Sequence, residues 1–198
     1  MSAKQEIAAA AARLVVEEGL EYGPAKRRAA KLLGLDGRRG AELPDNDEVE
    51  DEVFAYLALF CADTHPAELA ELRAIAATWM DRLAEFRPHL TGAVWRGTAT
   101  RRSAVHLQLF CDDPKAAEIA LVNRGVDYEV AETAGPRGQP VDRLRVHHRS
   151  AALGEFVTVF LTILDHDDLR GALKPDARGR TPRGDRAALE RLIAEAAA

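Results

Sequence analysis

Apolar residues recur at three- and four-residue spacing through most of the first 86 positions, and this period predicts helices. The expected helices span residues 3–18, 24–33, 46–60 and 67–86. In the first, Ile7, Leu14 and Val15 share one face. Gly19 and Gly34 follow the first two helices, at a position where glycine commonly ends a helix. We therefore predict a helical extension over residues 1–63.

After residue 89 the apolar period shortens to two, which indicates strands. Strands are expected at 90–94, 105–111, 126–130, 144–149 and 155–164, with helices at 114–123 and 186–197. The segment 155–164 is almost continuously apolar, as a central strand covered on both faces would be. Helices followed by mixed strands and helices predict an α+β fold class, with a small mixed sheet in a domain over residues 64–198.

The composition argues against several classes of function. Hydrophobic residues make up 47% and charged residues 30% of the 198 positions, as in ordinary globular proteins. The net charge of −5 argues against a protein whose main task is to bind nucleic acid. No signal peptide and no long apolar span stand out, so we expect a cytoplasmic protein with no membrane partner. Cys61 and Cys111 lie in apolar runs, which favours reduced core thiols over a disulfide or a zinc site.

Two acidic clusters resemble metal ligand sets but have a local explanation. The run from Asp45 to Glu52 and the run from Asp165 to Asp168 each lie where a helix is expected to begin. Acidic side chains cap helices there and interact favourably with the helix dipole. We therefore predict capping for both runs, and no metal site.

Basic residues gather in the second expected helix. Lys26, Arg27, Arg28 and Lys31 follow a glycine-containing turn, which leaves open a DNA-binding helix-turn-helix within residues 1–40. The spacing is loose and an acidic run follows at once, so a solvated basic face is the favoured interpretation. Nucleic acid is accordingly not expected as a partner.

The stretch from Leu90 to Phe110 carries the most specific pattern in the chain. An apolar segment leads into a glycine-bounded turn, and an alternating strand follows. This layout resembles the nucleotidyltransferase superfamily, the polymerase-beta-like fold, with Gly92-Ala93 at the position of the family's Gly-Ser pair. Ser103 precedes the family's Asp-x-Asp motif, whose two acid positions are here occupied by Ala104 and His106.

The resemblance implies a nucleotidyltransferase-like domain without the acids that hold its metal ions. Nucleotidyl transfer requires two divalent cations about 4 Å apart, and carboxylates are the ligands that Mg²⁺ prefers. We therefore expect a degenerate, non-catalytic member, with Mg²⁺ as a cofactor only if activity is retained. The alternative is an active transferase using substitute carboxylates. The catalytic candidates are His106, Asp127 and Glu129, and residues of the 144–164 strands are also left open as the source of the third acid.

The turn can still hold an anion if catalysis is lost. Its backbone N–H groups, hydroxyls and guanidinium groups are suitable donors to phosphate. The candidate anion-binding residues are Gly92, Arg96, Gly97, Thr98, Arg101, Arg102 and Ser103. The expected partner is a nucleotide, another small anionic ligand or a protein, and a homo-oligomer is left open.

Overall fold

Two units make up the computed structural model, which describes residues 2–36, 42–170, 175–176 and 178–196. One unit is helical and comprises the chain up to Glu68 together with Thr98–Ser103. The second is the α/β unit, comprising Leu69–Gly97 and the chain from Ala104 onward. The predicted extension over residues 1–63 corresponds to the first unit, which additionally includes residues 64–68 and the Thr98–Ser103 segment.

Three helices form the helical unit: α1 (Ala3–Glu18), α2 (Tyr22–Leu32) and α3 (Asn46–Phe60). Ser2 caps α1, and Asp45 caps α3 by accepting the N–H of Glu48, whose side chain bonds back to Asp45. The capping prediction for the first acidic run is therefore confirmed at its start. The buried core consists of small and branched residues of all three helices, including Ile7, Val15, Ala29, Val49, Val53 and Leu57.

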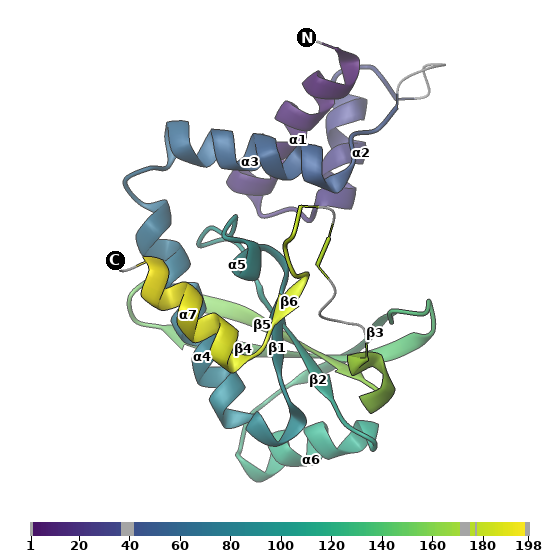
Figure 1. The fold of residues 1–198 in the computed structure, drawn as a ribbon, viewed down its shortest axis with the longest axis vertical. Coiled ribbons are helices and arrows are strands. Elements are labelled where there is room, and N and C mark those ends of the chain that lie inside the picture. Colours follow the sequence, from purple (N-terminus) through teal and green to yellow (C-terminus); the bar gives the residue numbers. More distant parts are fainter. Residues whose placement is uncertain (1, 37–41, 171–174, 177, 197–198) are drawn as a thin grey trace. The chain divides into compact units, whose positions relative to one another are not determined.

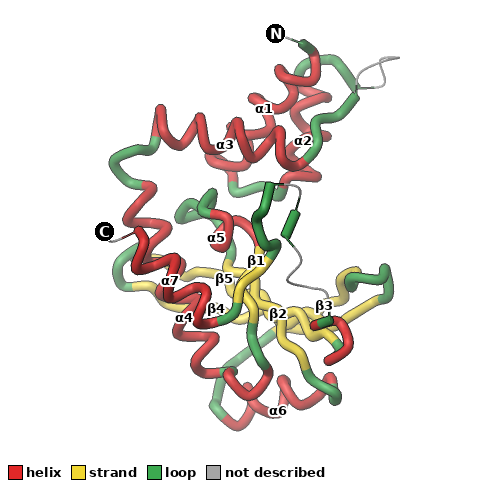
Figure 2. The backbone as a smooth tube through the Cα atoms, in the orientation of Figure 1, coloured by secondary structure: helices red, strands yellow, loops and turns green. Residues whose placement is uncertain are grey.

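The α/β unit alternates helices and strands. In chain order its elements are α4 (His65–Arg82, which begins in the helical unit), β1 (His89–Thr91), α5 (Gly92–Arg96), β2 (Val105–Phe110), α6 (Pro114–Asn123), β3 (Glu129–Ala134), β4 (Pro140–Ser150), β5 (Glu155–Leu164), β6 (Arg183–Gly184) and α7 (Arg186–Ala196). Short 3-10 helices span Ala84–Phe86 and His166–Leu169. The described part of the chain thus has the predicted α+β class, with seven α-helices and one six-stranded mixed sheet (Figures 1 and 2).

The strands lie in the order β3-β4-β5-β2-β1-β6. The β2–β5 pair is parallel, and the other neighbouring pairs are antiparallel. A parallel pair needs a crossover connection. Here α6 and the β3–β4 hairpin make that connection, and it places β5 beside β2 at the centre of the sheet.

One face of the sheet is buried, and we call it the dry face. The opposite face, which we call the wet face, is partly exposed to solvent. Leu107, Leu144, Val159 and Leu161 point to the dry face and are fully buried. Helix α4 contacts this face, since Trp79 lies edge-on to His148 of β4 and Glu71 accepts a hydrogen bond from the Ser150 hydroxyl at 2.7 Å. Burial of these apolar positions supplies the main stabilisation of the unit.

Several predicted boundaries differ from the structure, including the start of β4 at Pro140 rather than at 144 and the end of α4 at Arg82 rather than at 86. Three further differences have identifiable reasons. Residues Gly92–Val94 open a short helix instead of continuing β1, because Gly92 adopts a left-handed φ of 75° that ends the strand. Strand β3 begins at Glu129 rather than at 126, since the Val126 N–H donates to Leu121 O at the end of α6. The two-residue β6 lies in a segment expected to be a loop, where no apolar period is long enough to reveal it.

The capping prediction for the second acidic run is also confirmed at its start. Asp165 caps the 3-10 helix at His166–Leu169 by accepting the Asp167 N–H. Both cysteines are free thiols, and burial raises the pKa of each. Among the described residues, no helix is both long and apolar enough to cross a membrane.

We expect the protein to lose stability as the pH falls through about 6.5, the ordinary histidine pKa. Burial, with a contribution from Arg82, lowers the pKa of His148, so below pH 6.5 the unfolded chain binds more protons than the folded chain. The free energy of unfolding should therefore be lower at pH 5.5 than at pH 7.5, and His148→Gln should reduce the difference. Urea denaturation at both pH values measures this. His147→Gln, on the exposed face of β4, controls for loss of an imidazole from this strand, and an unchanged difference in His148→Gln would contradict the prediction.

Candidate functional site

The two acid positions of the resemblance lie at the start of β2, beside the strand-to-helix turn. Ala104 directly precedes the strand, and His106 is its second residue. His106 pairs with Thr91 of β1 on one side and with Phe160 of β5 on the other. The central strand next to β2 therefore presents an aromatic ring, and no carboxylate, opposite His106.

Gly92 brings the turn close to His106. A Cβ atom at position 92 would lie 3.6 Å from the imidazole Cδ2, which is ordinary van der Waals contact. Its φ of 75° lets the chain pass from β1 directly into α5. The turn thus borders the start of β2.

Three planar groups from three strands form a row across the sheet. The His106 and Phe160 rings are stacked, with centroids 5.2 Å apart and planes inclined by 28°. The Arg143 guanidinium of β4 lies over the Phe160 ring, 5.2 Å from its centroid. Cation–π attraction of this kind contributes about 0.5–1 kcal/mol at exposed sites. All three side chains are half-buried, so the row is accessible from the wet face.

This row belongs to a larger surface that we call the open face. Cross-strand partners point to the same side of a sheet, and alternate residues share a face. By this register Phe110 and Leu164 also lie on this side, where they are buried at the far ends of β2 and β5. The open face consists of the ten unburied side chains of β2, β4 and β5 on the same side, namely His106, Gln108, Arg143, Arg145, His147, Arg149, Phe156, Thr158, Phe160 and Thr162. None of the ten is buried, and none is a carboxylate. The surface is therefore cationic and partly aromatic.

The structure does not bring the proposed substitute acids to His106. Glu129 lies on the outer strand β3 and pairs with Arg145. Three strand spacings separate β3 from β2, or about 14 Å at 4.7–4.9 Å each. Asp127 lies in the exposed loop before β3. Neither carboxylate approaches the 4 Å geometry of a two-metal centre.

Ala104, His106 and Phe160 do not fit a Mg²⁺ site. Mg²⁺ requires hard oxygen ligands, and this position offers a methyl group, an imidazole and a benzene ring. Within the ranges that the structure describes, no group of three or more histidine, cysteine, aspartate or glutamate residues is arranged to hold a metal ion. We therefore derive no metal-dependent step for this position.

The predicted anion-binding turn is divided between the two units. Gly92, Arg96 and Gly97 belong to the α/β unit, whereas Thr98, Arg101, Arg102 and Ser103 belong to the helical unit. The two hydroxyls have local partners. The Thr98 hydroxyl is buried and lies 3.4 Å from the Tyr22 hydroxyl. The Ser103 hydroxyl accepts the Thr100 N–H at 3.0 Å.

Two of the four basic residues of the second helix also have local partners. Lys26 donates to the Asn46 side chain at 2.8 Å, and Arg28 pairs with Glu18. Arg38 and Arg39 lie outside the described residues. These contacts favour the interpretation of the described cations as a solvated basic face over a DNA-binding surface.

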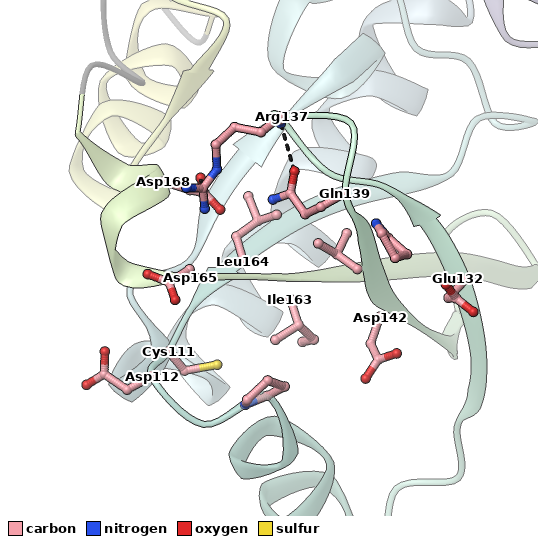
Figure 3. A pocket seen from close by; sticks show the side chains of 13 residues that line it. Cys111, Asp112, Glu132, Arg137, Gln139, Asp142, Ile163, Leu164, Asp165 and Asp168 are labelled. Carbon is pink, nitrogen blue, oxygen red and sulfur yellow. Dashed lines mark hydrogen bonds and ion pairs between the residues drawn. The ribbon is translucent and has the colours of Figure 1, made fainter.

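A pocket of about 360 Å³ opens at the far ends of β2 and β5, beside the start of α6 (Figure 3). Its floor includes Ile163 and Leu164, and Arg137 reaches across to Asp168 with an N–O distance of 3.2 Å. Five carboxylates line it: Asp112, Glu132, Asp142, Asp165 and Asp168. Their combined charge repels phosphate, so an anionic ligand is better accommodated on the open face.

Comparison with known proteins identifies no relative. No protein-family model, no curated protein and no solved structure matches the chain. The function of the chain must consequently be inferred from the residues of the site alone.

One pattern in the sequence indicates the open face, although the predictions above do not draw on it. In the segment from Arg143 to Arg149, cationic residues alternate with Leu144 and Val146 before His148. That alternation predicts one basic and one apolar face for the strand. The stacked partner Phe160 carries no comparable signal, because only the parallel β2–β5 pairing places it beside His106.

Proposed function

We propose that this chain is a non-catalytic protein of nucleotidyltransferase-like fold that binds a nucleotide on the open face of its sheet. The observation that carries the proposal is the row of His106, Phe160 and Arg143 at the position where the resemblance implies metal-binding acids. This row offers a base its outer planar groups, the His106 imidazole and the Arg143 guanidinium, and the guanidinium also suits a phosphate. It therefore suits direct contact with the nucleotide, without a bridging metal ion.

Arg143 is well placed to bind phosphate. Among the described residues no carboxylate pairs with it, and its buried Nε has no hydrogen-bond acceptor. Its charge is therefore not neutralised within the α/β unit as that of Arg145 is by Glu129. Guanidinium groups bind phosphate through charge-assisted hydrogen bonds, which contribute roughly 1.5–3 kcal/mol each.

The proposal excludes nucleotidyl transfer as the main activity. A transferase must stabilise the charge that develops on the attacking and leaving oxygens, and family members do so with carboxylate-bound cations. Here the strand beside β2 presents Thr158, Phe160 and Thr162 on the same face as His106. An active enzyme using Asp127 or Glu129 would need these acids to move across the sheet.

Isothermal titration with ATP, GTP, CTP and UTP tests the proposal, each in Mg²⁺ and in EDTA. We expect binding of at least one nucleotide in both conditions, because no metal ion bridges protein and phosphate. Arg143→Gln should weaken binding about tenfold or more, consistent with loss of one charge-assisted contact. Radiolabelled nucleotides should give no label transfer.

Arg124→Gln is the matched control for removal of an arginine. Arg124 lies just after α6 and pairs with Glu85, away from the open face. This variant should bind like the parent chain. Absence of binding by all four nucleotides would refute the proposal, and binding that requires Mg²⁺ and depends on Glu129 would instead favour the active transferase.

A further inference from the structure

The open face extends well beyond the nucleotide row, along the β4–β5 hairpin. Outward positions of β4 are Arg143, Arg145, His147 and Arg149. At about 3.4 Å per residue, the six steps from Arg143 to Arg149 span roughly 20 Å. A surface of this length accommodates several nucleotides, since single-strand sites in small sheet domains cover about 4–16 nucleotides.

Each end of this surface combines an arginine with a phenylalanine. Arg149 lies over the Phe156 ring at 5.2 Å, as Arg143 lies over Phe160. Phe156 is 61% exposed, which is unusual for a ring of this size in a strand. Two aromatic platforms on one strand, each beside its own cation, suit two separate bases of one chain together with their phosphates.

The positive charge of the surface is largely uncompensated. Of its three arginines, only Arg145 pairs with a carboxylate among the described residues, through Glu129 of β3. The α/β unit as a whole carries 17 basic and 18 acidic residues, a net charge of −1. Five of those acids gather in the pocket at the far end of β2 and β5. The near-zero net charge of the α/β unit is therefore compatible with a basic open face. The same holds for the overall net charge of −5.

We infer that the β4–β5 part of the open face binds single-stranded nucleic acid, with one base on Phe156, another on the row of His106, Phe160 and Arg143, and phosphates on Arg143 and Arg149. The inference rests on the proposed nucleotide site, because Phe160 and Arg143 belong to both. A single strand fits better than a duplex, since its unstacked bases are available to aromatic side chains. The exposed Phe156 ring also favours nucleic acid over an acidic peptide, because a peptide of that kind needs only cations for binding.

Fluorescence anisotropy with labelled 12-residue oligouridylate and oligothymidylate tests the inference on the full chain. We expect binding whose affinity falls with salt, and preference over both a duplex of equal length and a polyglutamate peptide. Phe156→Ala and Arg149→Gln should each weaken oligonucleotide binding about tenfold. Both should leave mononucleotide binding unchanged, because they lie outside the row. Circular dichroism checks that these exposed substitutions preserve the fold.

The outcomes separate the two proposals. Mononucleotide binding without tighter oligonucleotide binding overturns the inference and leaves the proposed function intact. Oligonucleotide binding that depends on Phe156 and Arg149, with no mononucleotide binding, supports the inference and overturns the proposed function. Equal binding of polyglutamate, or oligonucleotide binding unaffected by either substitution, overturns the inference. Arg124→Gln again serves as the control.

Discussion

Leu161→Ala should lower the free energy of unfolding of the α/β unit by about 2–5 kcal/mol, the range for a large-to-small change in a buried core. Leu161 lies in β5 between Leu107 of β2 and Leu144 of β4, and all three side chains are fully buried. Removing its side chain leaves a cavity that the paired strands cannot close. Urea denaturation followed by circular dichroism measures the loss.

Phe160→Ala is the matched comparison, since it changes the neighbouring residue on the opposite face. Phe160 is half-buried, so its removal should cost clearly less stability than that of Leu161. It should nevertheless abolish most nucleotide binding. Equal losses of stability in the two variants would mean that the open face is packed like the dry face, and the proposed site would then have no accessible ring.

Gly184→Ala should destabilise the β1–β6 edge by about 1–3 kcal/mol or more, as overpacking does. A Cβ atom at position 184 would lie 2.1 Å from the Trp95 ring, a distance that side chains do not tolerate. The ring is also held by the Trp95 indole N–H, which donates to Thr181 O at 2.7 Å. The indole must therefore move, and both the free energy of unfolding and the tryptophan fluorescence should change.

Gly23→Ala controls for the same chemical change in open surroundings. Gly23 lies in α2, and its added methyl group would meet only the flexible end of Arg27 at 3.5 Å. Alanine has the higher helix propensity, so this variant should be neutral or slightly more stable. If Gly184→Ala also leaves the free energy of unfolding unchanged or higher, Trp95 does not pack closely on β6.

The elements with strong periodic patterns could be predicted from the sequence. Helix α1 and strand β5 begin and end at the predicted residues, because a capping serine, a terminal glycine and a continuous apolar run mark their ends. Residues Gly92–Val94 were wrongly predicted as strand, since three residues are too few for an apolar period and the φ of Gly92 decides the turn.

The candidate site was less accessible to sequence reasoning than the fold. The position of His106 and the absence of the two acids can be recognised from the spacing within one segment. The environment of His106 depends on strand order, which the sequence does not specify. Glu129 was a reasonable substitute acid by position in the chain, but the order β3-β4-β5-β2 places two strands between it and His106. Phe160 and Arg143 occupy that intervening position instead.

The division of the Gly92–Ser103 stretch has a consequence for expressing the α/β unit alone. The chain enters the helical unit a second time at Thr98 and leaves it after Ser103, so a cut near residue 64 removes only part of that unit. In the full chain Thr98, Ala99 and Thr100 are buried, and the Thr98 hydroxyl lies 3.4 Å from the Tyr22 hydroxyl of α2. A truncated chain would present this six-residue segment, directly before β2, without its packing partners. Replacing Thr98–Ser103 with a short polar linker is therefore the appropriate design for isolating the sheet.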